Sequence, residues 1–136
     1  MRLLLFPLAA LLLGAAQPVE PEWRTAVEYD VLLRSWAYEP RIIRVPAGKP
    51  VRLYFVNQSP AEMAFGAPEL FRAARLRPRD GDIAARGGFR LAPGERRAVD
   101  LVAPLGRYPV HSFNRLHRLL GMSAEIVAEA GHLPGS

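Results

Sequence analysis

Apolar and polar residues alternate along several short stretches of the chain, with the period of two that is expected for β-strands. In residues 51–56, for example, Val51, Leu53 and Phe55 would share one face of a strand. The other stretches lie at residues 27–38, 42–45, 99–102, 107–112 and 122–128, with a further strand signal at Leu91. Proline and glycine separate them, as at Pro46 to Pro50 and at Pro93-Gly94. About seven short strands divided by such turns predict an all-β protein, a β-sandwich.

Residues 68–90 interrupt this pattern. The alternation is lost there, and six arginines gather between Arg72 and Arg90. We expect one or two helical turns over residues 68–76, followed by a flexible loop around Asp80-Gly81-Asp82 and Gly87-Gly88. The segment is therefore predicted to be a short helical or irregular insertion, presented either as a solvated loop or as a docking surface.

The N-terminus predicts export from the cytoplasm. Arg2 precedes an apolar run over residues 3–13, and small residues follow at 14–16, the three parts of a secretory signal. The run is too short to span a membrane. We expect a signal peptide at 1–16, a tether at 17–22, one domain at 23–129 and a flexible tail at 130–136, in a periplasmic or secreted protein whose mature chain has no transmembrane segment.

The amino-acid composition limits the ligands and partners that this chain can have. The 136 residues contain no cysteine, so neither a disulfide nor a thiolate ligand is available. The formal net charge is +5. In an exported protein such a basic surface meets anionic lipid headgroups, an anionic envelope or an acidic partner protein, so nucleic acid is not expected as a partner.

Several turns and strand ends occur in a recognisable order. Pro46-Ala47-Gly48-Lys49-Pro50 is followed by a strand ending at Asn57, then by Pro93-Gly94, and then by Gly106-Arg107-Tyr108 leading to His117 and Met122. This order resembles the cupredoxin family over residues 29–128. The resemblance implies a Greek-key β-sandwich or barrel of cupredoxin type, which holds one copper ion at its end through a His, a Cys, a second His and usually a Met.

Carried over to this chain, the family's metal ligands fall on a different set of side chains. The closing Tyr-x-Phe-x-Cys falls on Tyr108 to Ser112, so Ser112 stands in place of the cysteine, and the second His and the Met fall on His117 and Met122. The first His falls on Met63. A serine cannot supply the thiolate of a blue-copper centre, whereas two thioethers and an imidazole favour Cu(I).

Two further candidates extend this ligand set. Pro60-Ala61-Glu62-Met63 and Leu116-His117 are similar to segments of the cupredoxin-like components of bacterial iron and copper uptake systems. That similarity makes Glu62 a candidate ligand for a harder ion such as iron. His111 adjoins Ser112 and should point to the opposite face of its strand, so it could join only if the loop bulges there.

These observations predict a binding protein and not an enzyme. Ser112 lies near His111 and His117, but no Gly-x-Ser-x-Gly turn surrounds it and no orienting carboxylate is evident. We expect an exported protein that binds or transfers a soft metal, copper first and iron second, in exchange with an envelope transporter or acceptor protein. The alternatives are a metal-free interaction module in the cell envelope and an accessory component of a periplasmic iron uptake system.

Overall fold

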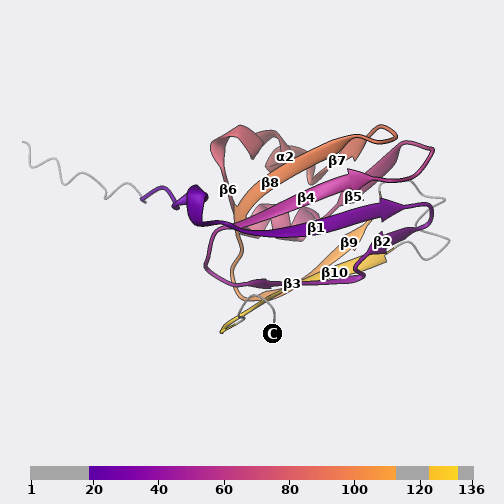
Figure 1. The fold of residues 1–136 in the computed structure, drawn as a ribbon. Helices are drawn as coiled ribbons and strands as arrows, with labels where there is room; N and C mark the ends of the chain where they lie inside the picture. Colours follow the sequence, from indigo (N-terminus) through magenta and orange to yellow (C-terminus); the bar gives the residue numbers. More distant parts are fainter. Residues whose placement is uncertain (1–18, 113–122, 132–136) are drawn as a thin grey trace, which may run out of the picture.

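The computed structural model describes residues 19–112 and 123–131, and these form a two-layer β-sandwich (Figure 1). Its first sheet has the strand order β2-β1-β4-β8-β6, and its second has the order β3-β10-β9-β5-β7. The strands are β1 (Val27–Arg34), β2 (Ala37–Glu39), β3 (Ile42–Pro46), β4 (Val51–Asn57), β5 (Met63–Gly66), β6 (Arg75–Leu76), β7 (Gly88–Leu91), β8 (Arg96–Val102), β9 (Gly106–His111) and β10 (Ser123–Glu129). The prediction of a Greek-key sandwich is confirmed, with ten strands in the described residues instead of about seven.

The alternation seen in the sequence decides which side chains form the core. Along β4, Val51, Leu53 and Phe55 are fully buried between the sheets, and the residues between them are only partly buried. Five aromatic rings pack in contact at the centre of this core, those of Tyr38, Phe55, Phe65, Phe71 and Phe89. Rings in such edge and tilted contacts add to the apolar area that each one buries.

Pairing between distant strands closes the sandwich. β1 runs parallel to β4, and β3 runs parallel to β10. The alternating stretch of residues 27–38 forms a hairpin, because Trp36 has a positive φ of 68° and reverses the chain into β2. A positive φ is uncommon for a bulky residue, which is why periodicity could not place this turn.

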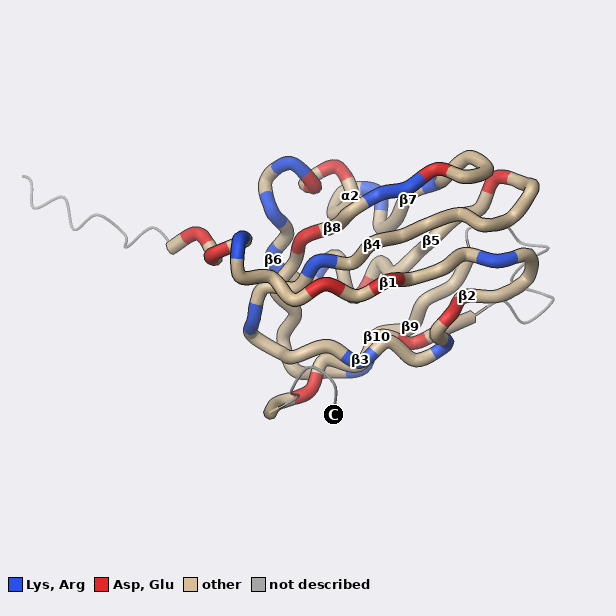
Figure 2. Tube along the Cα trace, viewed as in Figure 1, with Lys and Arg blue, Asp and Glu red and all other residues tan. Residues whose placement is uncertain are grey.

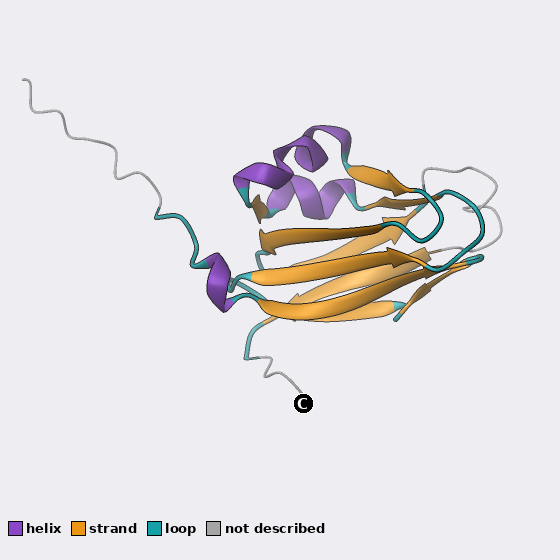
Figure 3. Ribbon diagram, turned by 45° about the horizontal axis from the view of Figure 1, so that its top comes forward, coloured by secondary structure: helices purple, strands orange, loops and turns teal. Residues whose placement is uncertain are grey.

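The region of residues 68–90 is more ordered than predicted. It contains α1 (Pro68–Ala73), the 3₁₀ helix η2 (Pro78–Asp80) and α2 (Gly81–Arg86), which lie together on one side of the sandwich (Figure 3). The helical insertion is confirmed, but the loop expected around residues 80–82 is wrong, because Asp80 is buried and ends η2 where α2 begins. The loop at Gly87-Gly88 is also wrong, since Gly88 already opens β7.

The segment before β1 contacts the domain. A 3₁₀ helix, η1 (Trp23–Thr25), buries Trp23, whose indole N–H donates to Glu20 at 2.7 Å. Glu20 also pairs with Arg75 of β6 at 3.1 Å. No helix in residues 19–112 and 123–131 is long and apolar enough to cross a membrane, and the predicted signal peptide lies outside these residues.

Candidate metal-binding end

Of the residues singled out by the sequence, those that the structure describes, Glu62, Met63, His111 and Ser112, belong to one end of the sandwich, on the right in Figure 1. There β4 ends, β5 begins, β9 ends and β10 begins. His111, the last residue of β9, pairs with Gly66 of β5 and with Ser123 of β10. Strand topology therefore brings together three segments that are distant in the sequence.

Asn57 organises the turns at this end. Its side chain is fully buried, and its amide nitrogen donates to the carbonyl oxygens of Ala61 at 2.8 Å and Leu91 at 3.0 Å. Its side-chain oxygen accepts the N–H of Ser59 at 2.9 Å. One amide thus satisfies backbone groups of two turns and fixes where the chain enters β5 at Met63.

Met63 opens β5 opposite Leu91 and is 2% exposed. It belongs to the main hydrophobic core. The thioether expected at the end of the sandwich is therefore the outermost residue of β5, but it is packed among apolar side chains. Methionine fills such irregular space well, and it can also ligate a soft metal.

Ser112, at the position where the resemblance puts a cysteine, is fully buried and hydrogen-bonded to Tyr38. The Tyr38 hydroxyl donates to the carbonyl oxygen of Ala64 at 2.7 Å. Burial raises the pKa of Tyr38 well above its usual value, and the hydrogen bond with Ser112 only partly opposes this rise. Tyr38 is therefore a neutral phenol at physiological pH, and Ser112 is engaged in a contact within the protein.

His111 and Glu62 lie outside the core. Burial alternates along β9, so Ser112 points inward while His111 lies on the other side of the strand and is half-buried, as expected from the sequence. Glu62 is exposed, and its carboxylate pairs with Arg90 at 3.2 Å.

His117 and Met122 lie outside the described residues, so their positions as ligands stay predictions. Within residues 19–112 and 123–131, no group of three His, Cys, Asp or Glu side chains is placed to hold a metal ion. A blue-copper centre does not fit this chain, because the sequence has no cysteine and Ser112 is bonded to Tyr38.

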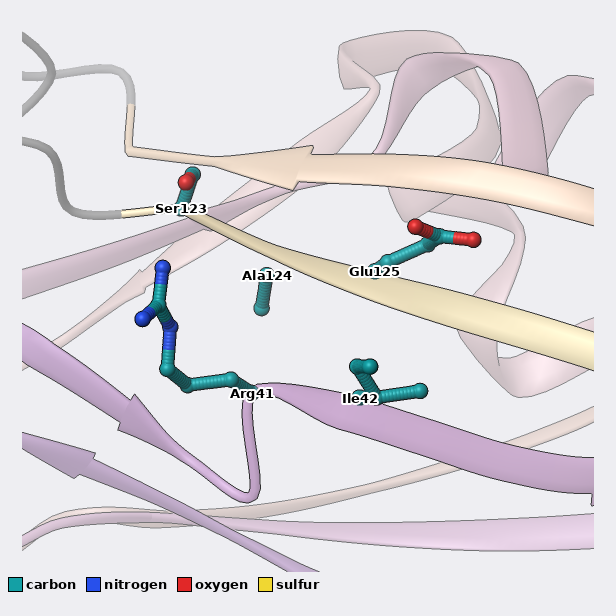
Figure 4. Close-up of a pocket in the computed structure, with 5 residues that line it drawn as sticks. All are labelled: Arg41, Ile42, Ser123, Ala124 and Glu125. Carbon is teal, nitrogen blue, oxygen red and sulfur yellow. The ribbon is translucent and has the colours of Figure 1, made fainter.

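A hollow of about 340 Å³ lies beside this end, between the beginnings of β3 and β10. Figure 4 shows its lining residues, Arg41, Ile42, Ser123, Ala124 and Glu125, with the guanidinium of Arg41 directed toward Ser123. Glu125 is paired with Arg107. The lining combines one guanidinium, one carboxylate and apolar side chains, and it includes no soft metal ligand.

The sequence did not reveal a charged cluster centred on the buried carboxylate of Asp100. Arg52, its cross-strand neighbour, donates to both carboxylate oxygens at 2.6 and 3.1 Å. Arg77 and Arg79 of the insertion each donate to one of these oxygens at 2.9 Å. The backbone N–H of Asp100 donates to Asp80 at 3.0 Å. The cluster fastens η2 to the outer face of β8, so these arginines belong to a structural contact instead of a solvated loop.

These contacts decide the protonation of Asp100. Burial by itself raises the pKa of this carboxyl, but the hydrogen bonds from Arg52 and Arg77 outweigh it. The positive charges of Arg52 and Arg79 act in the same direction, so the pKa lies below its usual value. Asp100 is therefore ionised at physiological pH. The alternation of Arg52 and Asp100 with apolar residues shows that both point outward, but it does not show that an insertion covers them.

Comparison with solved structures shows which known fold this chain shares. An auracyanin from the photosynthetic bacterium Roseiflexus castenholzii has a TM-score of 0.55 and 18% identity, over 76% of this chain and 98% of that one. Auracyanin A of Chloroflexus aurantiacus, described as a blue copper protein, has a TM-score of 0.52 and 18% identity, over 76% and 99%. This chain has a cupredoxin-like fold. The copper nitrite reductase of Nitrosomonas europaea is also similar, with a TM-score of 0.58 and 14% identity, over 81% of this chain and 51% of that one.

The cupredoxin-like architecture is thus established from structure. No protein-family model matches the chain, and no curated protein matches it in sequence. At the identities found, the similarity shows the fold alone, and the copper of those proteins is not thereby assigned to this chain.

Proposed function

We propose that this cupredoxin-like protein binds Cu(I) as cargo at the metal-binding end, through His117, Met122 and Met63, and passes the ion to an acceptor. The observation that carries the proposal is the position of Met63, which opens β5 three residues before Gly66, the partner of His111 at the end of β9. Ser112 and Ser123 flank the ten residues that carry His117 and Met122.

The chemistry of the ligands favours transfer over electron transfer. Thioether and imidazole ligands suit Cu(I), and neither carries a charge that would retain the ion strongly. An acceptor with further soft ligands could therefore replace them one at a time. In this proposal the protein binds a metal ion and catalyses no reaction.

The proposal includes the setting of the protein. An export signal at residues 1–16 would deliver it to the periplasm or the exterior, where a membrane transporter or a soluble acceptor would receive the copper. The absence of cysteine is compatible with an oxidising compartment, in which a free thiol would be vulnerable.

A Cu(I) titration against a competing chelator tests the function. We expect one Cu(I) per chain in the wild type and loss of binding in His117→Ala, because the imidazole is the proposed nitrogen ligand. His111→Ala is the matched control, since His111 lies on the other side of its strand from Ser112, and it should bind as the wild type does. Equal affinity in the wild type and His117→Ala would remove His117 from the site.

A metal-free interaction module is the second candidate function. It is favoured by the bond between Ser112 and Tyr38, which engages a position that the resemblance aligns with a ligand. Metal analysis after reconstitution separates the candidates, because a module of this kind would hold neither copper nor iron. Iron binding that is lost in Glu62→Gln would instead assign the protein to iron uptake.

A further inference from the structure

We propose that a pocket on the side of the sandwich, independent of the metal-binding end, binds a phosphate group. The pocket is a hollow of about 250 Å³. Its lining residues come from α2, β7 and β8 and are Asp82, Arg86, Gly88, Phe89, Arg90 and Arg97. In Figure 2 basic segments of the chain gather near the labels of these three elements.

The pocket has a surplus of positive charge. Arg97 is neutralised within the pocket, because one of its nitrogens lies 3.1 and 3.3 Å from the two carboxylate oxygens of Asp82. Arg90 is paired with Glu62, which lies outside the lining. Arg86 is exposed and has no carboxylate partner among residues 19–112 and 123–131. Three arginines thus face two carboxylates, those of Asp82 and Glu62, and one guanidinium charge is left uncompensated.

The fold fixes the side chain of Arg97 and the backbone positions of Arg86 and Arg90 before any ligand arrives. The guanidinium of Arg97 lies 5.2 Å from the centre of the Phe89 ring, a cation–π contact that limits its movement. Gly87 ends α2 with a φ of 73°, and a Cβ there would lie 3.0 Å from the Cβ of Pro68. This close turn carries the chain directly from Arg86 into β7, and so brings Arg86 and Arg90 to the same pocket.

A phosphate group fits this arrangement better than a carboxylate does. Guanidinium groups form paired, charge-assisted hydrogen bonds to both kinds of oxyanion. A phosphate group, however, offers more acceptor oxygens and a second negative charge, so it can engage guanidinium groups that approach from separate elements. Free phosphate and a phosphate ester share this chemistry, and both are sources that the pocket could use.

The test is a titration of the metal-free protein with inorganic phosphate. Binding is monitored by calorimetry and by the NMR chemical shifts of the Gly88 and Phe89 amides. An ionic strength of about 0.15 M limits unspecific attraction between distant charges. We expect saturable shifts at these amides and binding that is weakened about tenfold or more in Arg86→Gln, which removes one charged hydrogen-bond donor. Arg96→Gln removes the same charge from a neighbouring exposed position outside the pocket and should bind as the wild type does.

The remaining outcomes either identify the ligand or overturn the proposal. Methyl phosphate binding more tightly than inorganic phosphate would identify an ester as the ligand, and equal or weaker binding would identify the free ion. The absence of saturable shifts, equal losses in Arg86→Gln and Arg96→Gln, or acetate binding as tightly as phosphate would each overturn the proposal.

Discussion

The side chain of Ser112 is hydrogen-bonded to Tyr38, whose hydroxyl donates in turn to the carbonyl oxygen of Ala64 at 2.7 Å. These groups link the end of β9 to β2 and β5 inside the core. A serine at this position is therefore an integrated part of the packing, and the contact explains how a cupredoxin-like sandwich closes its end without a thiolate–metal bond.

Tyr38→Phe should destabilise the fold by about 1–3 kcal/mol, because the carbonyl of Ala64 and the hydroxyl of Ser112 would lose a buried partner. Urea unfolding followed by circular dichroism measures this change. Tyr29→Phe is the matched control. The Tyr29 hydroxyl is buried and has no hydrogen-bond partner among the described residues, so its removal should leave stability unchanged or raise it. Equal losses in the two variants would contradict the hydrogen-bonding role of Tyr38.

Asp100→Asn should destabilise the protein by about 3 kcal/mol, because three arginines would lose the buried charge that they surround. Glu28→Gln is the control, since exposed Glu28 contacts the same Arg52 at 3.6 Å, and it should cost less than about 1 kcal/mol. Hydrogen exchange should show that residues 75–86 open more readily in Asp100→Asn. Unchanged protection there would mean that Asp100 does not fasten the insertion.

Low pH should lower the free energy of unfolding by protonating Asp100. The pKa of Asp100 is lower in the folded protein than its usual value, so its contribution to stability is complete above about pH 4 and is lost as the pH falls through the folded pKa. The free energy of unfolding of the wild type should therefore fall below about pH 4 more steeply than that of Asp100→Asn. Parallel pH profiles of the two proteins would refute this assignment.

The sequence predicted most of the sandwich because its strands alternate clearly. Burial along β4 and β9 follows that alternation. The insertion was predicted less well, because Asp80 and Asp82 look like loop residues when read alone. Asp80 accepts the N–H of Asp100, 20 positions away, and Asp82 pairs with Arg97, 15 positions away. Local pattern carries no information on such pairing.

The candidate site, like the fold, was predicted only in part from the sequence. The resemblance placed Met63, Ser112 and Glu62 near one end of the fold, and strand topology brings their segments together. It did not reveal that Ser112 contacts Tyr38 or that Arg90 pairs with Glu62. Those contacts arise from strands that meet only in the folded chain.

X-ray absorption at the copper edge of Cu(I)-loaded protein containing selenomethionine tests the central claim most directly. The chain has three methionines, and Met1 lies in the predicted signal peptide, so selenium scattering near copper would come from Met63 and Met122. The account predicts copper–selenium scattering together with the nitrogen scattering of one imidazole, and a weaker selenium contribution in Met63→Leu. Copper surrounded only by nitrogen and oxygen, or no copper retained, would contradict it.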